Sequence, residues 1–344
     1  MATRSPSPLF RRLELAFHTQ YAELRERSHG EGAQLPGTPG ALVLRTGTGY
    51  GYWYRRYNSL PNQEVEDLVC KEADQEAKQT MQSRIEAASW TQGQVRQMRR
   101  LGMQVADKDV CRLLVELHNK HLFEGGLLVV GTLAYMSWLN ELGALAVSAK
   151  TQDIDLARRR VLKLGAPLSF LATVEATRLQ FFPVPGMPNS AHSTSLKRPG
   201  PAGLRVDLLT SGGRLGAVVP VPELAWHAQT VPHFDYLLDK PSLAAVLAGG
   251  HCIPVNLPRP ERFVWHKLYS STKRRADAAK ARKDLTQAAV LGAVLVETDA
   301  GSLEEAARDA PHEILEAARS RLPGLKGLLQ AHPQALEQFQ LVLA

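Results

Sequence analysis

Three aspartates have the residue type and spacing that metal-assisted phosphate chemistry requires. Asp153 and Asp155 are two positions apart in DIDLA, and Asp207 lies in LRVDLLT; both segments are predicted to form short strands. Residues two apart on a strand point to the same face and lie roughly 7 Å apart. Carboxylates this close repel each other unless a cation lies between them, and a divalent metal is the usual solution. The three carboxylates therefore predict a site for a metal-bound triphosphate.

A glycine turn ahead of these strands would position the phosphates. The apolar run Leu127–Val130 ends at Gly131-Thr132, and an apolar-rich segment continues to Leu142, which predicts strand, turn and helix. Gly131 lets the backbone approach a phosphate, because a side chain there would collide. Thr132 would cap the helix and offer its hydroxyl and backbone N–H groups to the phosphates. Without the aspartates, this dipeptide would indicate only the start of a helix.

The combination resembles the DNA polymerase beta-like nucleotidyltransferase superfamily, and in particular bacterial nucleotidyltransferase-like proteins of unassigned substrate. The similarity rests on Gly131-Thr132, Asp153-Ile154-Asp155 and Asp207, and it extends to PRPERFVWHKLYSS and ARKDLTQA downstream. The superfamily more often has serine or glycine at the position of Thr132, and threonine keeps the hydroxyl. The resemblance covers residues 122–295 and leaves the first hundred residues outside.

The resemblance implies an α/β (α+β) fold built on a small mixed sheet, with an NTP as substrate and Mg²⁺ or Mn²⁺ as cofactor. Asp153 and Asp155 would ligate the metal ions. Asp207 would complete the metal site and would also accept the proton of the attacking hydroxyl. A lysine at the position of Lys267 reaches back toward the triphosphate in similar proteins, and a solvated lysine on an amphipathic helix is the alternative.

Two further sets of residues are candidates on weaker grounds. A strand, a Pro-Gly turn and a second strand are expected over AHSTSLKRPGPAGLRVDLLTS. Antiparallel pairing would place Ser193, Ser195 and Lys197 beside the Asp207 strand, where Lys197 or Arg198 would neutralise phosphate charge. Asp284 would orient a basic neighbour, and a surface pair with Lys280 is the alternative.

Composition indicates the class of protein. The 344 residues carry a net charge of +7, with a pI near 9.4, so a polyanionic partner is plausible. Three scattered cysteines fit a reducing cytoplasm and argue against a zinc site. No apolar run is long enough to span a membrane, and no signal peptide is evident. We expect a cytoplasmic protein without a membrane partner.

Basic residues gather in three clusters, for which solvated helix faces are the ordinary interpretation and nucleic-acid binding the functional one. They are Arg96, Arg99 and Arg100; Arg158, Arg159, Arg160 and Lys163; and Lys273, Arg274, Arg275, Lys280, Arg282 and Lys283.

Three regions are predicted. Residues 1–104 would hold a helix over 8–28, a β-hairpin with strands at 41–46 and 50–57, and a long helical region from 62 to 101. Residues 105–220 would form the catalytic domain, and residues 221–344 a mainly helical domain. The aromatic and basic residues from Tyr50 to Tyr57 would either stack nucleic-acid bases or simply cover a helix.

The predicted activity is transfer of a nucleoside monophosphate from an NTP to an acceptor hydroxyl by a two-metal mechanism. RNA, a protein or a small molecule are all open as acceptors, and a toxin–antitoxin or defence system is one setting for such an enzyme. The alternative is a catalytically silent nucleotide- or nucleic-acid-binding regulatory protein.

Overall fold

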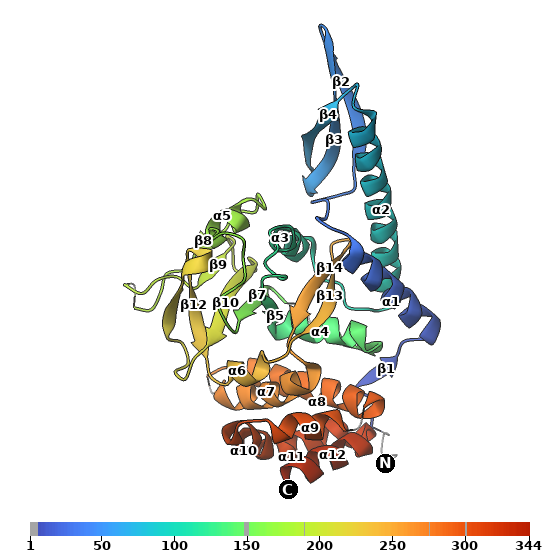
Figure 1. Ribbon diagram of the computed structural model, residues 1–344. Coiled ribbons are helices and arrows are strands. Elements are labelled where there is room, and N and C mark those ends of the chain that lie inside the picture. The colour runs from blue at the N-terminus through green and yellow to red at the C-terminus, as the bar shows by residue number, and fades with distance from the viewer. Residues whose placement is uncertain (1–5, 148–150, 189, 275, 300) are drawn as a thin grey trace.

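A computed structural model describes residues 6–147, 151–188, 190–274, 276–299 and 301–344. Its largest element is a mixed sheet at the centre of the molecule (Figure 1). The strands are β5 (Leu128–Val130), β7 (Asp153–Arg158), β8 (Phe182–Pro183), β9 (Ser195–Lys197), β10 (Arg205–Ser211), β11 (Val218–Val221), β12 (Trp226–Val231), β13 (Ser242–Ala248) and β14 (His251–Leu257). Their main path is β11-β12-β10-β7-β5-β14-β13, and β9 with β8 joins at β10. The predicted α+β class with a small mixed sheet is confirmed.

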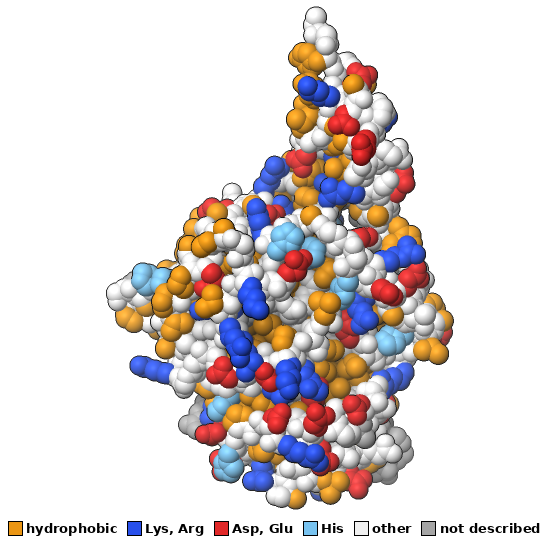
Figure 2. Space-filling view, viewed as in Figure 1, with side chains coloured by type: hydrophobic (Ala, Val, Ile, Leu, Met, Phe, Trp, Pro, Cys, Tyr) orange, Lys and Arg blue, Asp and Glu red, His pale blue; other side chains and the backbone are white. Residues whose placement is uncertain are grey.

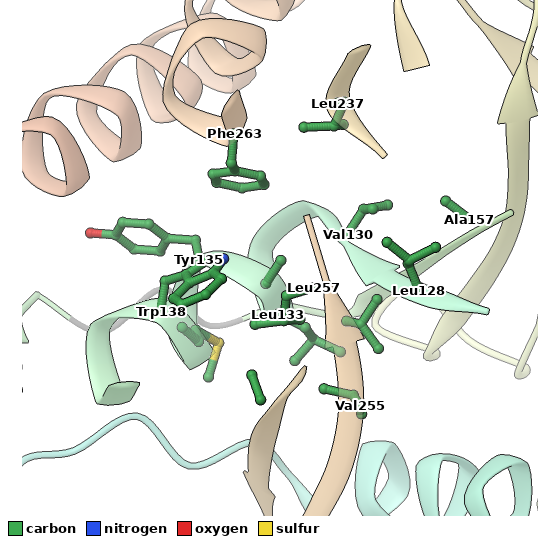
Figure 3. Close-up of a cluster of buried hydrophobic side chains, with 14 of the residues drawn as sticks. Leu128, Val130, Leu133, Tyr135, Trp138, Ala157, Leu237, Val255, Leu257 and Phe263 are labelled. Atoms are coloured by element: carbon green, nitrogen blue, oxygen red, sulfur yellow. The ribbon is translucent and has the colours of Figure 1, made fainter. Parts of the chain in front are cut away.

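Two helices begin beside the central strands. They are α3 (Lys108–Asn119) and α4 (Gly131–Glu141), followed by β6 (Ala144–Ala146) and the short α5 (Phe170–Glu175). α4 packs on β5, β7 and β13, while α3 packs on β13 and β14. Figure 3 shows Leu133 and Trp138 of α4 lying among Val255 and Leu257 of β14, with Phe263 approaching from the helical layer. The indole N–H of Trp138 donates to the Pro258 carbonyl at 3.0 Å. This bond and the apolar contacts fix the position of α4 against β14.

The C-terminal part forms a layer of helices below the sheet in the view of Figure 1. It comprises α6 (Phe234–Leu237), α7 (Pro260–Lys273), α8 (Ala278–Thr298), α9 (Ser302–Arg308), α10 (His312–Ser320), α11 (Leu322–Leu328) and α12 (Pro333–Leu343), with 3-10 turns at Pro222–Leu224 and Leu329–Ala331. The main sheet includes β12, β13 and β14, so it extends past residue 220, the predicted start of the C-terminal domain. Among the described residues, no helix has both the length and the apolar character needed to cross a membrane.

The N-terminal part differs from expectation at two places. Its elements are β1 (Phe10–Arg12), α1 (Leu15–Gly30), β2 (Ala41–Gly47), β3 (Tyr50–Leu60), β4 (Gln63–Lys71) and α2 (Gln75–Arg100). The predicted helix over 8–28 is wrong at its start, because Phe10–Arg12 pairs with β6. The hairpin is confirmed, but residues 63–71 form a third strand instead of a helix. A two-residue turn at Pro61-Asn62, with Asn62 at φ 61°, returns the chain onto β3.

The three-stranded sheet β2-β3-β4 lies along α2 and projects from the body (Figure 1). The Lys78 ammonium of α2 lies 4.3 Å from the centre of the Trp53 ring. The buried Arg55 guanidinium donates to the carbonyls of Pro36, Thr38 and Pro39. This face of the aromatic strand therefore supports the interpretation in which it covers a helix, and Arg55 is not free to bind a phosphate.

Candidate active site

The strand register places the three predicted aspartates on one face of the sheet. β7 and β10 run parallel, pairing Asp155 with Asp207 and Asp153 with Arg205. Paired residues on neighbouring strands project to the same face, and residues two apart on one strand do so as well. Ile154 and Val206 point to the opposite face and are fully buried. The alternation of acidic and apolar residues thus buries one face of each strand and leaves the carboxylates together on the other.

The glycine turn lies directly against one of these carboxylates. Val130 of β5 pairs with Asp155, and Gly131 follows with a φ of 66°. A Cβ atom at Gly131 would lie 1.9 Å from Oδ2 of Asp155, so only glycine leaves room for the carboxylate. The prediction that Thr132 caps the helix is wrong: α4 begins one residue earlier, at Gly131, and Val130 is its N-cap residue. Thr132 is buried in the first turn.

The surroundings of Asp155 disfavour its negative charge. Burial and the nearby charges of Asp207 and Asp153 raise the pKa of this carboxyl to about 6, against the opposing effect of Lys267 and Arg274. A divalent cation beside Asp155 would reverse this balance, because positive charge favours the ionised form. The electrostatics of the site therefore suit a bound cation.

Asp207 is held by two neighbours in the same part of the sheet. The Ser195 hydroxyl donates to Oδ1 of Asp207, and Nε of Arg205 donates to the same oxygen at 2.8 Å. Nη2 of Arg205 also donates to the Ser195 hydroxyl at 2.9 Å. Within the described part of the chain, no three His, Cys, Asp or Glu side chains are grouped closely enough to hold a metal ion. The donor types and the register fit Mg²⁺ or Mn²⁺, and binding would require these side chains to converge further.

Basic residues of the helical layer lie near the carboxylates. Nζ of Lys267 on α7 is 2.7 Å from Oδ1 of Asp284 on α8, and both residues are buried. Nε of Arg274 is 2.5 Å from the other oxygen of Asp284. Burial alone would raise the pKa of Asp284, but the charges of Lys267 and Arg274 outweigh it and lower that pKa. The alternatives, a solvated Lys267 and a surface ion pair between Asp284 and Lys280, are both wrong. Asp284 is buried and holds Lys267 in place.

Lys283 is a further cation near the site, and the predicted site residues did not include it. Partial burial lowers the pKa of this lysine, as does the charge of Lys267, while Asp284, Asp153 and Asp155 act in the opposite direction. The sequence feature that could have identified Lys283 is its position in a basic cluster, directly before Asp284. Arg275 of that cluster lies outside the described residues.

The antiparallel strand pair is present as predicted. β9 pairs with β10, so Ser195 is paired with Asp207 and Lys197 with Arg205. Lys197 therefore shares the face of the aspartates, two residues further along the strand from Ser195. Arg198 forms an ion pair with Asp109 of α3. The role of Arg205 was missed because its bond to Asp207 depends on a side-chain direction that sequence does not specify.

The comparison with known families agrees with this arrangement. The model of a nucleotidyltransferase family matches residues 108–312, which is well over half of the chain. The chain belongs to this nucleotidyltransferase family. No curated protein and no solved structure matches it. The matched residues include β5, α4, β7, β9, β10, α7 and α8, which together carry every predicted site residue of this nucleotidyltransferase.

Proposed function

We propose that this nucleotidyltransferase transfers a nucleoside monophosphate from an NTP to an acceptor hydroxyl at the face formed by β7, β10 and the start of α4. The observation that carries the proposal is the register that pairs Asp155 with Asp207 while Gly131 lies against Asp155. The raised pKa of Asp155 supports it, because a carboxylate in such surroundings gains most from a bound cation.

Each part of the site has a role in this reaction. The acceptor oxygen attacks the α-phosphorus, the bond from that phosphorus to the bridging oxygen breaks, and pyrophosphate leaves with the electron pair. Asp207 takes the hydroxyl proton. Asp153, Asp155 and Asp207 would hold Mg²⁺ or Mn²⁺, which supplies positive charge that stabilises the attacking and leaving oxygens together.

The phosphates would lie between the start of α4 and the helical layer. Gly131 and Thr132 present backbone N–H groups at the positive end of α4. Lys267 and Lys283 supply positive charge from α7 and α8, and Lys197 supplies it from β9. We expect closure of these groups over the nucleotide to exclude water, which would otherwise compete as the acceptor.

Label transfer tests the proposal. The protein is incubated with each of the four α-³²P-labelled NTPs, Mg²⁺ or Mn²⁺, and separate pools of RNA, protein and small-molecule acceptors. We expect label on one pool, its loss in Asp155→Asn, and its retention in Glu26→Gln, which changes an exposed acid on α1. Absence of label in every pool, with unchanged nucleotide binding in Asp155→Asn, would favour the silent regulatory protein instead.

A further inference from the structure

A basic cleft lies apart from the aspartates, at the base of the projecting sheet. Its volume is about 570 Å³, and its walls are the β3–β4 turn, the C-terminal half of α2, the first turns of α3 and the Gly249-Gly250 turn. None of the described residues that line it is acidic. Its cationic residues are Arg96, Arg99, Arg100, Lys108 and Arg112.

Most of this positive charge is uncompensated. Arg96 donates to the Gln92 amide oxygen at 2.7 Å, and Arg99 faces the Ala106 carbonyl at 3.5 Å. Within the described part of the chain, Arg112 alone of the five forms an ion pair, with Glu116 at 3.1 Å. Arg112 is only 8% exposed, and its Nε is buried without a hydrogen-bond partner among the described residues. Its Nη1 and Nη2 donate to Glu116 and to the Ala176 carbonyl, so the other four cations supply the unpaired charge of the cleft.

The cations are spaced to follow a phosphate backbone. Arg96 and Arg100 are four residues apart on α2, and Lys108 and Arg112 are four residues apart on α3. Four residues of helix rise about 6 Å, so two rows of positive charge with a similar repeat line the cleft. Gly249 and Gly250, with φ of 55° and 108°, let this turn pack closely against α3 and α2 at the end of the cleft, since a Cβ at Gly249 would lie 2.7 Å from Cβ of Cys111. A single-stranded nucleic acid carries negative charge at such a repeat, and a compact anion would use only part of it.

A second hollow lies beside the cleft at the start of α3. Lys108 faces the cleft, while Asp107 and Asp109 line this hollow of about 380 Å³ together with Gln152 and Arg198. Gln152 precedes Asp153 in the chain. Figure 2 shows Lys and Arg side chains at the base of the projecting sheet and again down the front of the body toward the helical layer. Most of the cleft wall precedes residue 108 and is outside the family match.

We propose that this cleft binds the phosphodiester backbone of a single-stranded nucleic acid, and that the bound strand carries the acceptor hydroxyl. The second part rests on the proposed nucleotidyl transfer, whereas the first part is independent of it. The N-terminal sheet and α2 then serve to hold the acceptor, and the family domain supplies the chemistry.

Binding is measured first, in EDTA and without nucleotide, so that it does not depend on catalysis. Fluorescence anisotropy follows a labelled 20-nucleotide RNA, or DNA of the same sequence, against the full chain at several salt concentrations. The cleft variant is Arg96→Gln/Arg100→Gln/Lys108→Gln. The control variant is Arg11→Gln/Arg308→Gln/Lys326→Gln, which removes the same charge from exposed positions outside the cleft.

We expect the cleft variant to bind at least ten-fold more weakly at about 0.1 M salt, with a salt slope shallower by about 2 for three lost phosphate contacts. The control should bind like the wild type. Comparison of RNA with DNA identifies which strand is preferred. Equal weakening in both variants, no binding by the wild type, or equally strong displacement by polyglutamate would overturn the nucleic-acid assignment.

Label transfer to the strand tests the second part. The cleft variant should raise the KM for the strand and leave the KM for the NTP unchanged. A strand that binds in the cleft but receives no label, while another acceptor is labelled, would overturn its role as acceptor and leave the proposed transfer intact. If the wild type labels no acceptor at all, the proposed function is contradicted. The binding of the strand in the cleft is unaffected by that result.

Discussion

Asp155 shows how a carboxylate with a proposed catalytic role opposes folding. It lies between Gly131 and Asp207, in surroundings that raise its pKa to about 6 by burial and by the negative charge of its neighbours. The folded chain therefore favours the protonated acid, and its stability falls as the pH rises from the usual 3.8 through about 6. The proposed cation site therefore lowers the stability of the folded chain when no cation is bound.

Replacing Asp155 by Asn should stabilise the metal-free protein. The pKa difference corresponds to roughly 3 kcal/mol at pH 7, and because the side chain retains some contact with water, we expect an increase of about 2 kcal/mol in the free energy of unfolding. Urea unfolding in EDTA measures it at pH 7, where the difference should be larger than at pH 4. A variant less stable than the wild type at pH 7 would contradict this electrostatic account. Glu26→Gln, an exposed change, should have no effect.

Gly131→Ala should remove activity without unfolding the chain. The new Cβ would meet Oδ2 of Asp155 at 1.9 Å, and the φ of 66° is strained for alanine. The carboxylate must move, and a displacement of about 1 Å can reduce a rate on the order of 100-fold. Label transfer measures the loss, and circular dichroism checks the fold. Gly93→Ala, in the interior of α2 with open space around it, is the control and should keep full activity.

At the scale of elements, one ion pair network fixes the helical layer. Asp284 of α8 contacts both Lys267 and Arg274 of the α7 segment, and Asp284 and Lys267 are nearly inaccessible to water. Removing one partner of a buried pair leaves an uncompensated charge and costs more than the pair itself contributes. The network therefore couples the packing of α7 on α8 to the position of Lys267.

Asp284→Asn should lower the free energy of unfolding by roughly 3 kcal/mol, because the buried Lys267 loses its counter-charge. Chemical denaturation measures the change. The double variant Lys267→Met/Asp284→Leu removes both charges and should recover most of the stability, yet remain defective in NTP binding. Equal stability of the single and double variants would show that the loss comes from packing and not from the unpaired lysine.

Sequence patterns identified the elements whose signals are local. The apolar run Leu127–Val130, the glycine turn and the alternating DIDLA segment predicted β5, α4 and β7 to within a few residues. Strand β4 was missed because QEVEDLVCK has a helix-like composition, and its partner β3 decides its structure. The bond between Arg205 and Asp207 and the cleft charges of Lys108 and Arg112 depend on how distant elements pack, which no local pattern records.

For the whole molecule, the central sheet separates two basic regions. The helical layer with Lys267 and Lys283 lies on one side, and the cleft of α2, α3 and the β3–β4 turn lies toward the projecting sheet (Figure 1). The proposed nucleotide and acceptor would reach the aspartates from these different directions. Transfer then needs the sheet and the helical layer to keep their relative position, so contacts between them bear on both stability and activity.

His266 provides one such contact and predicts how the whole fold responds to acid. Its ring on α7 packs against Phe234 and lies 3.3 Å from the Pro232 carbonyl, just after β12. Burial, together with the charges of Lys267 and His233, lowers the pKa of His266 to about 4, against the opposing effect of the Pro232 contact and Asp284. Below about pH 6.5 the imidazole is protonated in the unfolded chain but stays neutral in the folded chain. The free energy of unfolding therefore decreases as the pH falls from 6.5 toward 4.

The expected loss from this residue is about 2 kcal/mol between pH 7.5 and pH 5. Urea unfolding of His266→Gln should show a pH dependence that is weaker by this amount, even where the substitution lowers stability at every pH. His312→Gln, which changes an exposed histidine of α10, should retain the wild-type slope. An unchanged slope in His266→Gln would mean that other groups bind the proton, and that acid does not loosen the helical layer from the sheet at this contact.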